Sequence, residues 1–311
     1  MTSNSTLCSP VNLRVASAPA AAAASEAAIN AAGLRMARTA SIEVSVKSAH
    51  LVSDCARWLA PGTEIFISML PGQVYDQTIT AAAALKGAGF EPVAHVTARG
   101  INGQAMAHDV FARLAAAGVT RALVLGGDRV PVPGAYDSAL ALLESGAPAR
   151  AGFRRIYVSG YPEGHPMIAD AVLSEHLTRK LAWCHAHDIG AAVVTQFSFD
   201  EACVGAWLDR MAVQFPGTRV VAGVAGPAGA ATLLRYAAVC GVRASMSLLT
   251  RHSGKLMRAL AETGPEALVR SLARREVARG QAAGLHLFSF GGTERTARWC
   301  HAAAQTRADP R

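Results

Sequence analysis

The chain has 311 residues, of which 51% are hydrophobic and only 17% are charged, enough apolar material for one large domain or two small ones. No apolar run reaches the length of a membrane span, so we expect a soluble, cytoplasmic protein without a membrane partner. The net charge of +8 is scattered and forms no basic stripe interleaved with aromatic residues, which argues against nucleic acid and suits a small anionic ligand.

Residues 1–39 are rich in Ala and Ser, and we expect a disordered or loosely helical N-terminal arm. The stretch 20–24 follows no basic region and has no strongly apolar core, so it is a poor signal peptide. The six cysteines form no Cys-x-x-Cys pair, which favours reduced thiols and predicts no metal site.

From residue 40 on, short runs with the character of β-strands alternate with helical stretches. The sequence predicts strands at 40–47, 64–70, 92–98, 121–127, 155–161, 191–199, 219–225 and 284–291. It predicts helices at 49–59, 73–88, 103–117, 136–144, 168–187, 201–213, 228–239 and 294–304, with a longer helical tract at 251–282.

This alternation predicts a (β/α)8 TIM barrel over residues 40–305, a single domain with extra helices before the eighth strand. The competing architecture is an open doubly wound sheet, which usually carries a Gly-rich dinucleotide turn after its first strand. Here Val46-Lys47-Ser48-Ala49 follows the first strand, and the barrel is therefore the better prediction.

Glu43 lies in the middle of the first predicted strand, between Ser41 and Ser45 on the polar side and opposite the apolar residues of the other side. A carboxylate on a central strand is costly unless it is hydrogen-bonded, paired or protonated. Glu43 is therefore either a functional acid or a buried ion-pair partner.

Further polar residues recur where the predicted strands end, which is where a TIM barrel places its chemistry. Each has an ordinary structural explanation: Asp128 can cap a turn, His95 can be a hydrogen-bonded core residue, His165 can hold a proline-flanked loop, and Tyr136 can pack on a helix. The recurrence around one end of the barrel favours a site.

The motifs at these strand ends resemble the methylenetetrahydrofolate reductase family. They are Tyr-Pro-Glu-x-His-Pro at 161–166, Leu-x-Arg-Lys at 177–180, Thr-Gln-Phe-x-Phe-Asp at 195–200, His-x-Thr at 95–97 and Leu-x-Gly-Asp at 125–128. Together with the glutamate of the first strand they follow the family's order from about residue 40 to about residue 300.

The resemblance implies a barrel that binds FAD at the strand ends and passes hydride from NAD(P)H through the flavin to 5,10-methylenetetrahydrofolate, giving 5-methyltetrahydrofolate. It implies that Glu43 is the general acid that helps to open the methylene bridge, that Asp128 lies near flavin and pterin, and that Gln196 and Phe288 contact the folate. It also implies that the FAD is lined by His95, Thr97, Gly127, Asp128, Tyr136, Tyr161, His165 and Lys180, with Lys180 near the phosphates.

A general acid must still hold its proton near neutral pH if it is to protonate N10 of the folate. A carboxyl group shielded in the mouth of a barrel is suited to this, since desolvation raises its pKa. We therefore expect a raised pKa for Glu43.

The chain departs from the family pattern at several strand ends. Gly126 stands in place of the arginine of an Arg-Gly-Asp motif, Met69-Leu70-Pro71-Gly72 replaces Val-Thr-Tyr-Gly, and Val44-Ser45-Val46-Lys47 replaces Phe-Phe-Pro-Pro. After the last strand Phe288-Ser289-Phe290-Gly291-Gly292 lacks an arginine available to folate, while Arg129 is a candidate to replace the cation lost at 126. These departures favour a divergent member, acting in one-carbon catabolism, that holds FAD weakly or not at all.

Two alternatives stay open. One is a non-catalytic or flavin-free folate-binding member that acts with a partner subunit. The other is an unrelated barrel lyase or aldolase that uses Lys47. The sequence leaves open the direction of reaction, NADH against NADPH, the residue that stacks on the pterin, and the assembly, a homo-oligomer included.

Overall fold

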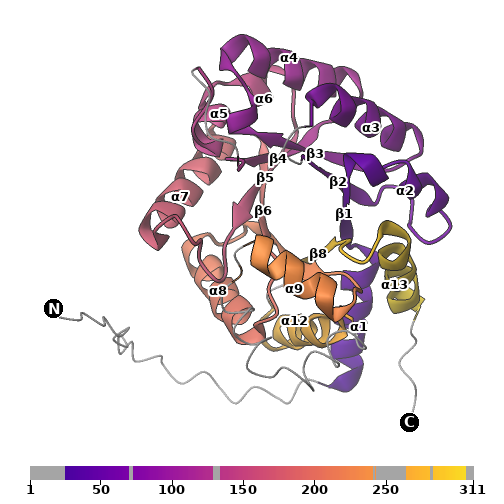
Figure 1. The fold of residues 1–311 in the computed structure, drawn as a ribbon. Coiled ribbons are helices and arrows are strands. Elements are labelled where there is room, and N and C mark those ends of the chain that lie inside the picture. The colour runs from indigo at the N-terminus through magenta and orange to yellow at the C-terminus, as the bar shows by residue number, and fades with distance from the viewer. Residues whose placement is uncertain are drawn as a thin grey trace.

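The computed structural model describes residues 25–69, 73–128, 134–240, 242, 264–280 and 283–305. Eight parallel strands close into a barrel in which every strand pairs with its neighbours in sequence and β8 pairs with β1 (Figure 1). The strands are β1 Ser41–Ser45, β2 Glu64–Ser68, β3 Glu91–Thr97, β4 Arg121–Leu125, β5 Arg155–Gly160, β6 Gly190–Thr195, β7 Arg219–Ala225 and β8 Gly284–Phe288. The predicted (β/α)8 barrel is confirmed.

Most strands end earlier than the sequence predicts, and only 219–225 is recovered with both bounds. After β1 the chain turns into the short 3-10 helix η1 (Val46–Ser48), in which Ser45 and Ser48 cap each other. After β6 it leaves the sheet at Gln196, although apolar residues continue through Phe199. Apolar residues at these ends therefore belong to the loops that cover the barrel mouth.

A ring of helices surrounds the strands (Figure 1). These helices are α1 Glu26–Arg38, α2 Leu51–Asp54, α3 Tyr75–Gly87, α4 Gly103–Ala116, α5 Ala139–Glu144, α6 Ala147–Arg150, α7 Asp170–Ala186, α8 Glu201–Gln214, α9 Ala230–Val239, α12 Glu266–Arg279 and α13 Thr293–Gln305, with the 3-10 helix η2 Ala98–Gly100 after β3. Of the helical tract predicted at 251–282, the described part is α12, and 251–263 lie outside the described residues.

The helix predicted at 136–144 begins three residues later, at Ala139. Ser138 is its N-cap and accepts a hydrogen bond from the backbone N–H of Ala141. A serine in extended conformation that caps the first turn is a common helix start, and it places Tyr136 in the loop before the helix.

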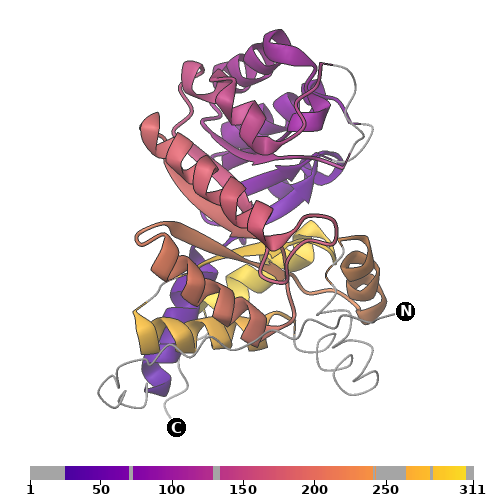
Figure 2. The same ribbon diagram turned by 90° about the vertical axis from the view of Figure 1, so that its left-hand side faces the viewer.

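Residues 26–38, expected to lie in the N-terminal arm, form the regular helix α1. Ile29, Ala32 and Ala273 make a small buried cluster between α1 and α12. Ion pairs join the same two helices, from Arg35 to Glu276 at 2.5 Å and from Arg270 to Glu26. Figure 2 shows α1, in indigo, beside the yellow helices α12 and α13. This segment is more regular than the arm the sequence predicts.

Two apolar layers build the barrel. Residues such as Ile42 and Val44 face outward and pack beneath the helices in the main core. The inside of the barrel is filled by the second layer, Phe66, Val93, Leu123, Tyr157, Ala192, Val194 and Val221. Because neighbouring side chains alternate along a strand, Glu43 lies on the inner side of β1.

The described cysteines, Cys55, Cys184, Cys203, Cys240 and Cys300, are all free. Within the described ranges no His, Cys, Asp and Glu side chains gather in a group able to hold a metal ion. No helix in these ranges has both the length and the apolar character needed to span a membrane.

Candidate active site

Inside the barrel, Glu43 lies between two histidines from other strands. Its Oε2 is 3.4 Å from Nε2 of His95 on β3 and 3.5 Å from Nε2 of His286 on β8. The side chain of Glu43 is 19% exposed, that of His95 7% and that of His286 only 1%. The expected carboxylate is therefore part of a three-residue cluster, of which the sequence analysis identified two members and missed His286.

The cluster rests on the aromatic layer inside the barrel. The ring of Phe66 contacts His286 with centroids 4.4 Å apart and His95 at 6.1 Å, and its other side packs edge-on against Tyr157. These rings separate Glu43 from the opposite end of the barrel. Access to the carboxylate is consequently from the C-terminal ends of the strands.

His286 is oriented by Ser41 on the neighbouring strand. The Oγ of Ser41 lies 2.9 Å from Nδ1 of His286 and 3.4 Å from the carbonyl oxygen of Leu285. A hydrogen bond from Nε2–H of a neutral His286 to Glu43 leaves Nδ1 as an acceptor, to which Ser41 donates in preference to the more distant Leu285 carbonyl oxygen. The Nε2 of His95 is buried and has no hydrogen-bond partner among the described residues.

The pKa of Glu43 departs from the expectation. Burial acts to raise the pKa of this carboxyl group, but the charge interaction with His95, the hydrogen bond from His286 and the charge of His286 together lower it below its usual value. The predicted raised pKa is therefore wrong, because desolvation is outweighed by imidazoles that the sequence did not place beside the carboxylate. Burial lowers the pKa of His95, and the negative charge of Glu43 opposes that effect.

Asp128 lies at the exposed rim of the same barrel end, directly after β4. Its negative charge raises the pKa values of Tyr161, His165 and Cys240, although burial is the larger effect in Tyr161 and Cys240 and lowers the pKa in His165. The carboxylate of Glu43 also raises the pKa of Cys240. Asp128, Tyr161, His165 and Glu43 thus surround one region of the barrel mouth.

Arg99, on η2, supplies a cation to this rim that the sequence analysis missed. Its guanidinium Nη1 donates to the carbonyl oxygen of Gly127 at 2.7 Å, and its positive charge acts to lower the pKa of His165. Its Nε is buried without a hydrogen-bond partner among the described residues. Arg129, the expected replacement for the cation lost at Gly126, lies outside the described residues.

Gly127 is required by the geometry of this turn. Its φ is +87°, and a Cβ at this position would lie 3.0 Å from Cβ of Thr97. Thr97 is itself held by Tyr75, whose hydroxyl donates to the Thr97 carbonyl oxygen at 3.0 Å and lies 3.3 Å from its Oγ1. The turn after β4 therefore packs directly on the end of β3.

The Tyr161–His165 segment forms a compact corner after β5. The two rings meet edge to face with centroids 5.3 Å apart, and the backbone N–H of Met167 donates to Nδ1 of His165 at 3.2 Å. With Nδ1 accepting, a neutral His165 carries its proton on Nε2. His165 therefore does help to hold this loop, which is the structural role considered for it from the sequence.

Gln196 follows β6 and donates from its Nε2 to the carbonyl oxygen of Cys240 at 2.6 Å. This hydrogen bond fixes the orientation of the amide group, and Oε1 of Gln196 then points away from Cys240. Since Cys240 also lies within the fields of Glu43 and Asp128, Gln196 belongs to the same barrel end.

A row of aromatic rings extends from the cluster toward α9. His286 meets Phe288 at 4.8 Å, Phe288 stacks on Phe290 at 5.4 Å, and Phe290 stacks on Tyr236 at 4.0 Å. Phe197 contacts both phenylalanines edge to face. Phe290 and Tyr236 were not identified from the sequence, because Phe290 fell within the predicted strand 284–291 and Tyr236 within the predicted helix 228–239, where an aromatic residue ordinarily packs in the core.

Lys180 lies on α7 and is 8% exposed. Burial lowers its pKa to about 8, with a small opposing effect from the Cys184 thiol. No carboxylate among the described residues comes within 4.0 Å of its ammonium group. A buried cation without a counter-charge is costly, which marks a place where an anion would be stabilised.

Tyr136 is partly buried and packs against the main core. Lys47 is exposed on η1, which removes it as the internal Schiff-base lysine of a barrel aldolase. Leu70, Pro71 and Gly72, which replace a hydroxyl-bearing family motif, lie outside the described residues.

Two comparisons bear on this geometry. Residues 51–303 match the sequence model of the family described as methylenetetrahydrofolate reductase. A solved structure described as an uncharacterized protein from Clostridium thermocellum that binds two copies of 5-methyl-5,6,7,8-tetrahydrofolic acid superposes with a TM-score of 0.55 and covers 88% of this chain and 96% of its own. At 10% sequence identity this likeness shows the fold alone.

Proposed function

Since the chain belongs to the methylenetetrahydrofolate reductase family, we propose that it is a flavin-dependent oxidoreductase that interconverts 5,10-methylenetetrahydrofolate and 5-methyltetrahydrofolate with NAD(P)H. The observation that carries the proposal is the cluster of Glu43, His95 and His286 on the inner side of the barrel. Opening the methylene bridge needs a proton at a folate nitrogen, and this cluster is a proton store that faces the barrel mouth.

The proton belongs to the cluster rather than to an isolated glutamic acid. With Nδ1 of His286 accepting from Ser41, a neutral His286 holds its proton on Nε2, facing Glu43. A buried carboxylate with two neutral imidazoles carries a net negative charge, which one shared proton removes. Glu43 then delivers that proton to N10 of the folate, and the histidines restore it.

The folate is held by groups around this proton store. Gln196, whose amide is fixed by Cys240, offers Oε1 to the N–H groups of a pterin ring. Phe288 continues into the aromatic row with Phe290 and Tyr236, which supplies an apolar surface for the flat ring system. Asp128 at the rim is available to the amino group of the pterin or to the flavin.

The residues present fit a flavin dinucleotide. Lys180 is a buried cation without a counter-charge among the described residues, and the guanidinium of Arg99 is tied to the Gly127 turn with one buried nitrogen unsatisfied. Both suit a diphosphate. Thr97, Tyr161 and His165 complete the proposed flavin-binding set, and Arg99 replaces the cation lost at Gly126. Bound flavin would supply the hydride transfer between NAD(P)H and folate.

The test is conversion of folate by the purified protein. Protein incubated with FAD should take up the flavin and, with NADH or NADPH, convert 5,10-methylenetetrahydrofolate to the 5-methyl form, or run the reverse reaction with an electron acceptor. Bound flavin is read from the visible spectrum and folate from chromatography. Absence of conversion in both directions at saturating FAD would refute the reductase function.

A second candidate is a flavin-free folate-binding protein acting with a partner subunit. It is favoured by Gly126 and by the altered segment that starts at Met69, both of which reduce the expected contacts to flavin. The similar structure from Clostridium thermocellum binds two copies of 5-methyl-5,6,7,8-tetrahydrofolic acid. Calorimetric binding of 5-methyltetrahydrofolate by protein that takes up no FAD would decide for this candidate.

A further inference from the structure

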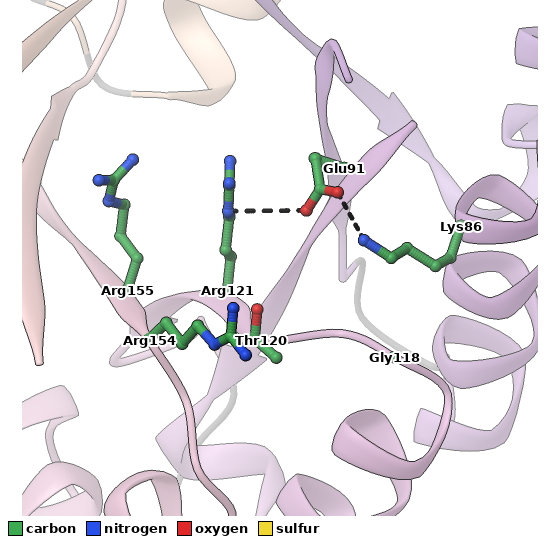
Figure 3. A pocket seen from close by; sticks show the side chains of 7 residues that line it. All are labelled: Lys86, Glu91, Gly118, Thr120, Arg121, Arg154 and Arg155. Atoms are coloured by element: carbon green, nitrogen blue, oxygen red, sulfur yellow. Dashed lines mark hydrogen bonds and ion pairs between the residues drawn. The ribbon is translucent and has the colours of Figure 1, made fainter. Parts of the chain in front are cut away.

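A cavity of about 460 Å³ lies at the opposite end of the barrel from the Glu43 cluster. Figure 3 shows its lining, which comes from the starts of β3, β4 and β5, from the loops before them and from the end of α3: Lys86, Glu91, Gly118, Thr120, Arg121, Arg154 and Arg155. Glu91, Arg121 and Arg155 are the first residues of their strands. A volume of this size is typical of small-molecule sites.

Part of the charge at this end is used to close the barrel. Glu64, the first residue of β2, is 2.5 Å from Arg121, 3.3 Å from Arg219 and 3.9 Å from Arg155, and it accepts a hydrogen bond from the Tyr157 hydroxyl at 2.5 Å. The five groups form a polar floor under the aromatic layer. A single carboxylate that already has these partners cannot neutralise three guanidinium groups.

Glu91 supplies the second carboxylate. It lies 2.5 Å from the ammonium of Lys86 and 3.7 Å from Arg121. The basic residues at this end are Lys86, Arg121, Arg154, Arg155 and Arg219, set against Glu64 and Glu91, so the set has an excess of three positive charges. The polar floor that closes the barrel accounts for some of these cations. It does not account for the three positive charges in excess.

Arg154 is the clearest part of the excess. Its side chain is exposed and forms no ion pair among the described residues, and in Figure 3 no dashed line reaches it. Its backbone is nevertheless fixed, since its N–H donates to Thr120 at 2.9 Å and its carbonyl oxygen accepts from Gly190 at 3.0 Å. The guanidinium group therefore starts from a rigid point on the cavity wall.

We propose that this cavity binds a small polyvalent oxyanion, such as a phosphorylated metabolite or a polycarboxylate. Arg154 and Arg155 offer planar forks of N–H donors that match phosphate and carboxylate oxygens, and Thr120 adds a hydroxyl group. Lys86 and Arg121 remain paired with Glu91, and their positive charges add electrostatic attraction for the anion. The site is independent of the proposed folate chemistry, because the aromatic layer lies between the two ends of the barrel.

The test is calorimetric titration of the full chain with inorganic pyrophosphate and, separately, with tricarballylate, at low salt and again at about 0.15 M salt, where screening is stronger. We expect saturable binding of one equivalent of at least one anion, weaker at the higher salt. Preference for pyrophosphate would identify phosphate chemistry, and preference for tricarballylate would identify carboxylate chemistry. No saturable binding of either anion would refute the proposal.

Two variants locate the binding. Arg154→Gln should weaken it about tenfold or more, since a charge-assisted pair is lost, while leaving the melting temperature unchanged. Arg295→Gln, which removes a similarly exposed arginine on α13 across the barrel, should bind as the unaltered protein does. Lys180→Met, which removes the proposed flavin-phosphate contact, should also retain binding. Equal affinity in Arg154→Gln, or loss only in Lys180→Met, would contradict this site.

Discussion

Nε2 of His286 lies 3.5 Å from Oε2 of Glu43, and the contact joins the first and last strands of the barrel at its proposed proton donor. Together with the larger charge effect of His95, this contact outweighs burial and lowers the pKa of the Glu43 carboxyl group. In the proposed mechanism the acid is a proton shared between the Glu43 carboxylate and its two imidazole neighbours. The protonation of Glu43 therefore depends on His95 and His286. A scheme with Glu43 as the single acid would give neither histidine a role.

Replacing His286 should change the pH dependence of the folate step. In His286→Phe the hydrogen bond and charge of His286 that lower the pKa of Glu43 are lost while the charge effect of His95 stays, so the pKa of Glu43 rises. We expect the alkaline limb of flavin reoxidation by methylenetetrahydrofolate to move to higher pH, with a rate lower by about tenfold or more because the histidine no longer restores the proton. Stopped-flow spectroscopy across pH measures both effects.

An exposed histidine on α7, replaced in His185→Phe, is the matched control and should leave the profile unchanged. An unchanged profile in His286→Phe itself would show that Glu43 works as an isolated acid.

Replacing Lys180 should separate stability from flavin binding. Its pKa of about 8 lies below the ordinary 10.5, so below pH 8 the fold carries a buried charge that the unfolded chain exposes to water. Lys180→Met should stabilise the flavin-free protein at pH 7 by about 3 kcal/mol at most and weaken FAD binding about tenfold or more.

The stability difference should shrink as the pH rises from 8 toward 10.5, since the folded protein then loses this proton. Denaturant unfolding at several pH values and flavin titration give the two readouts. The exposed Lys47→Met is the control and should change neither. A less stable Lys180→Met variant at pH 7 would mean that the ammonium group already has a counter-charge.

The pair Gly126 and Gly127 offers a test of the turn after β4. A Cβ at Gly127 would require a left-handed backbone and would lie 3.0 Å from Thr97, while one at Gly126 would meet nothing within 4 Å. Gly127→Ala should therefore lose about 1–3 kcal/mol of stability and weaken flavin binding through the displaced turn, and Gly126→Ala should be close to neutral. Equal effects of the two substitutions on thermal unfolding would rule out this account of the turn.

The barrel could be predicted because its signals are local. Most strands carry β-branched residues, and many helix stops have a glycine or a polar residue, so the element order can be read without knowing any contact. The strand ends were less accurate, because apolar residues such as Phe197 and Phe199 continue past β6 into the loops that line the mouth. There an apolar residue packs on other loops rather than on the sheet.

The site was predicted in part for a different reason. Glu43 was identifiable because a carboxylate flanked by β-branched residues has no ordinary place in a core. His286 was not, since its meaning depends on β8 closing against β1, a contact between residues 243 positions apart in the chain that no local pattern encodes. One signal was available. His286 and Phe288 are two residues apart on β8 and therefore lie on the same side of the strand, so the assignment of Phe288 to the folate implied that His286 faces the barrel interior as well. Arg99 was missed because it acts through the neighbouring turn, on Gly127.

The most direct test of the central claim is the Glu43→Gln variant measured in separate half-reactions by rapid mixing. We expect flavin reduction by NAD(P)H to keep its rate, because Glu43 holds no part of the proposed flavin-phosphate site. Reoxidation of the reduced flavin by methylenetetrahydrofolate should fall by about 10²–10⁴-fold, because the amide cannot deliver the proton. Reoxidation at the unaltered rate would contradict the account.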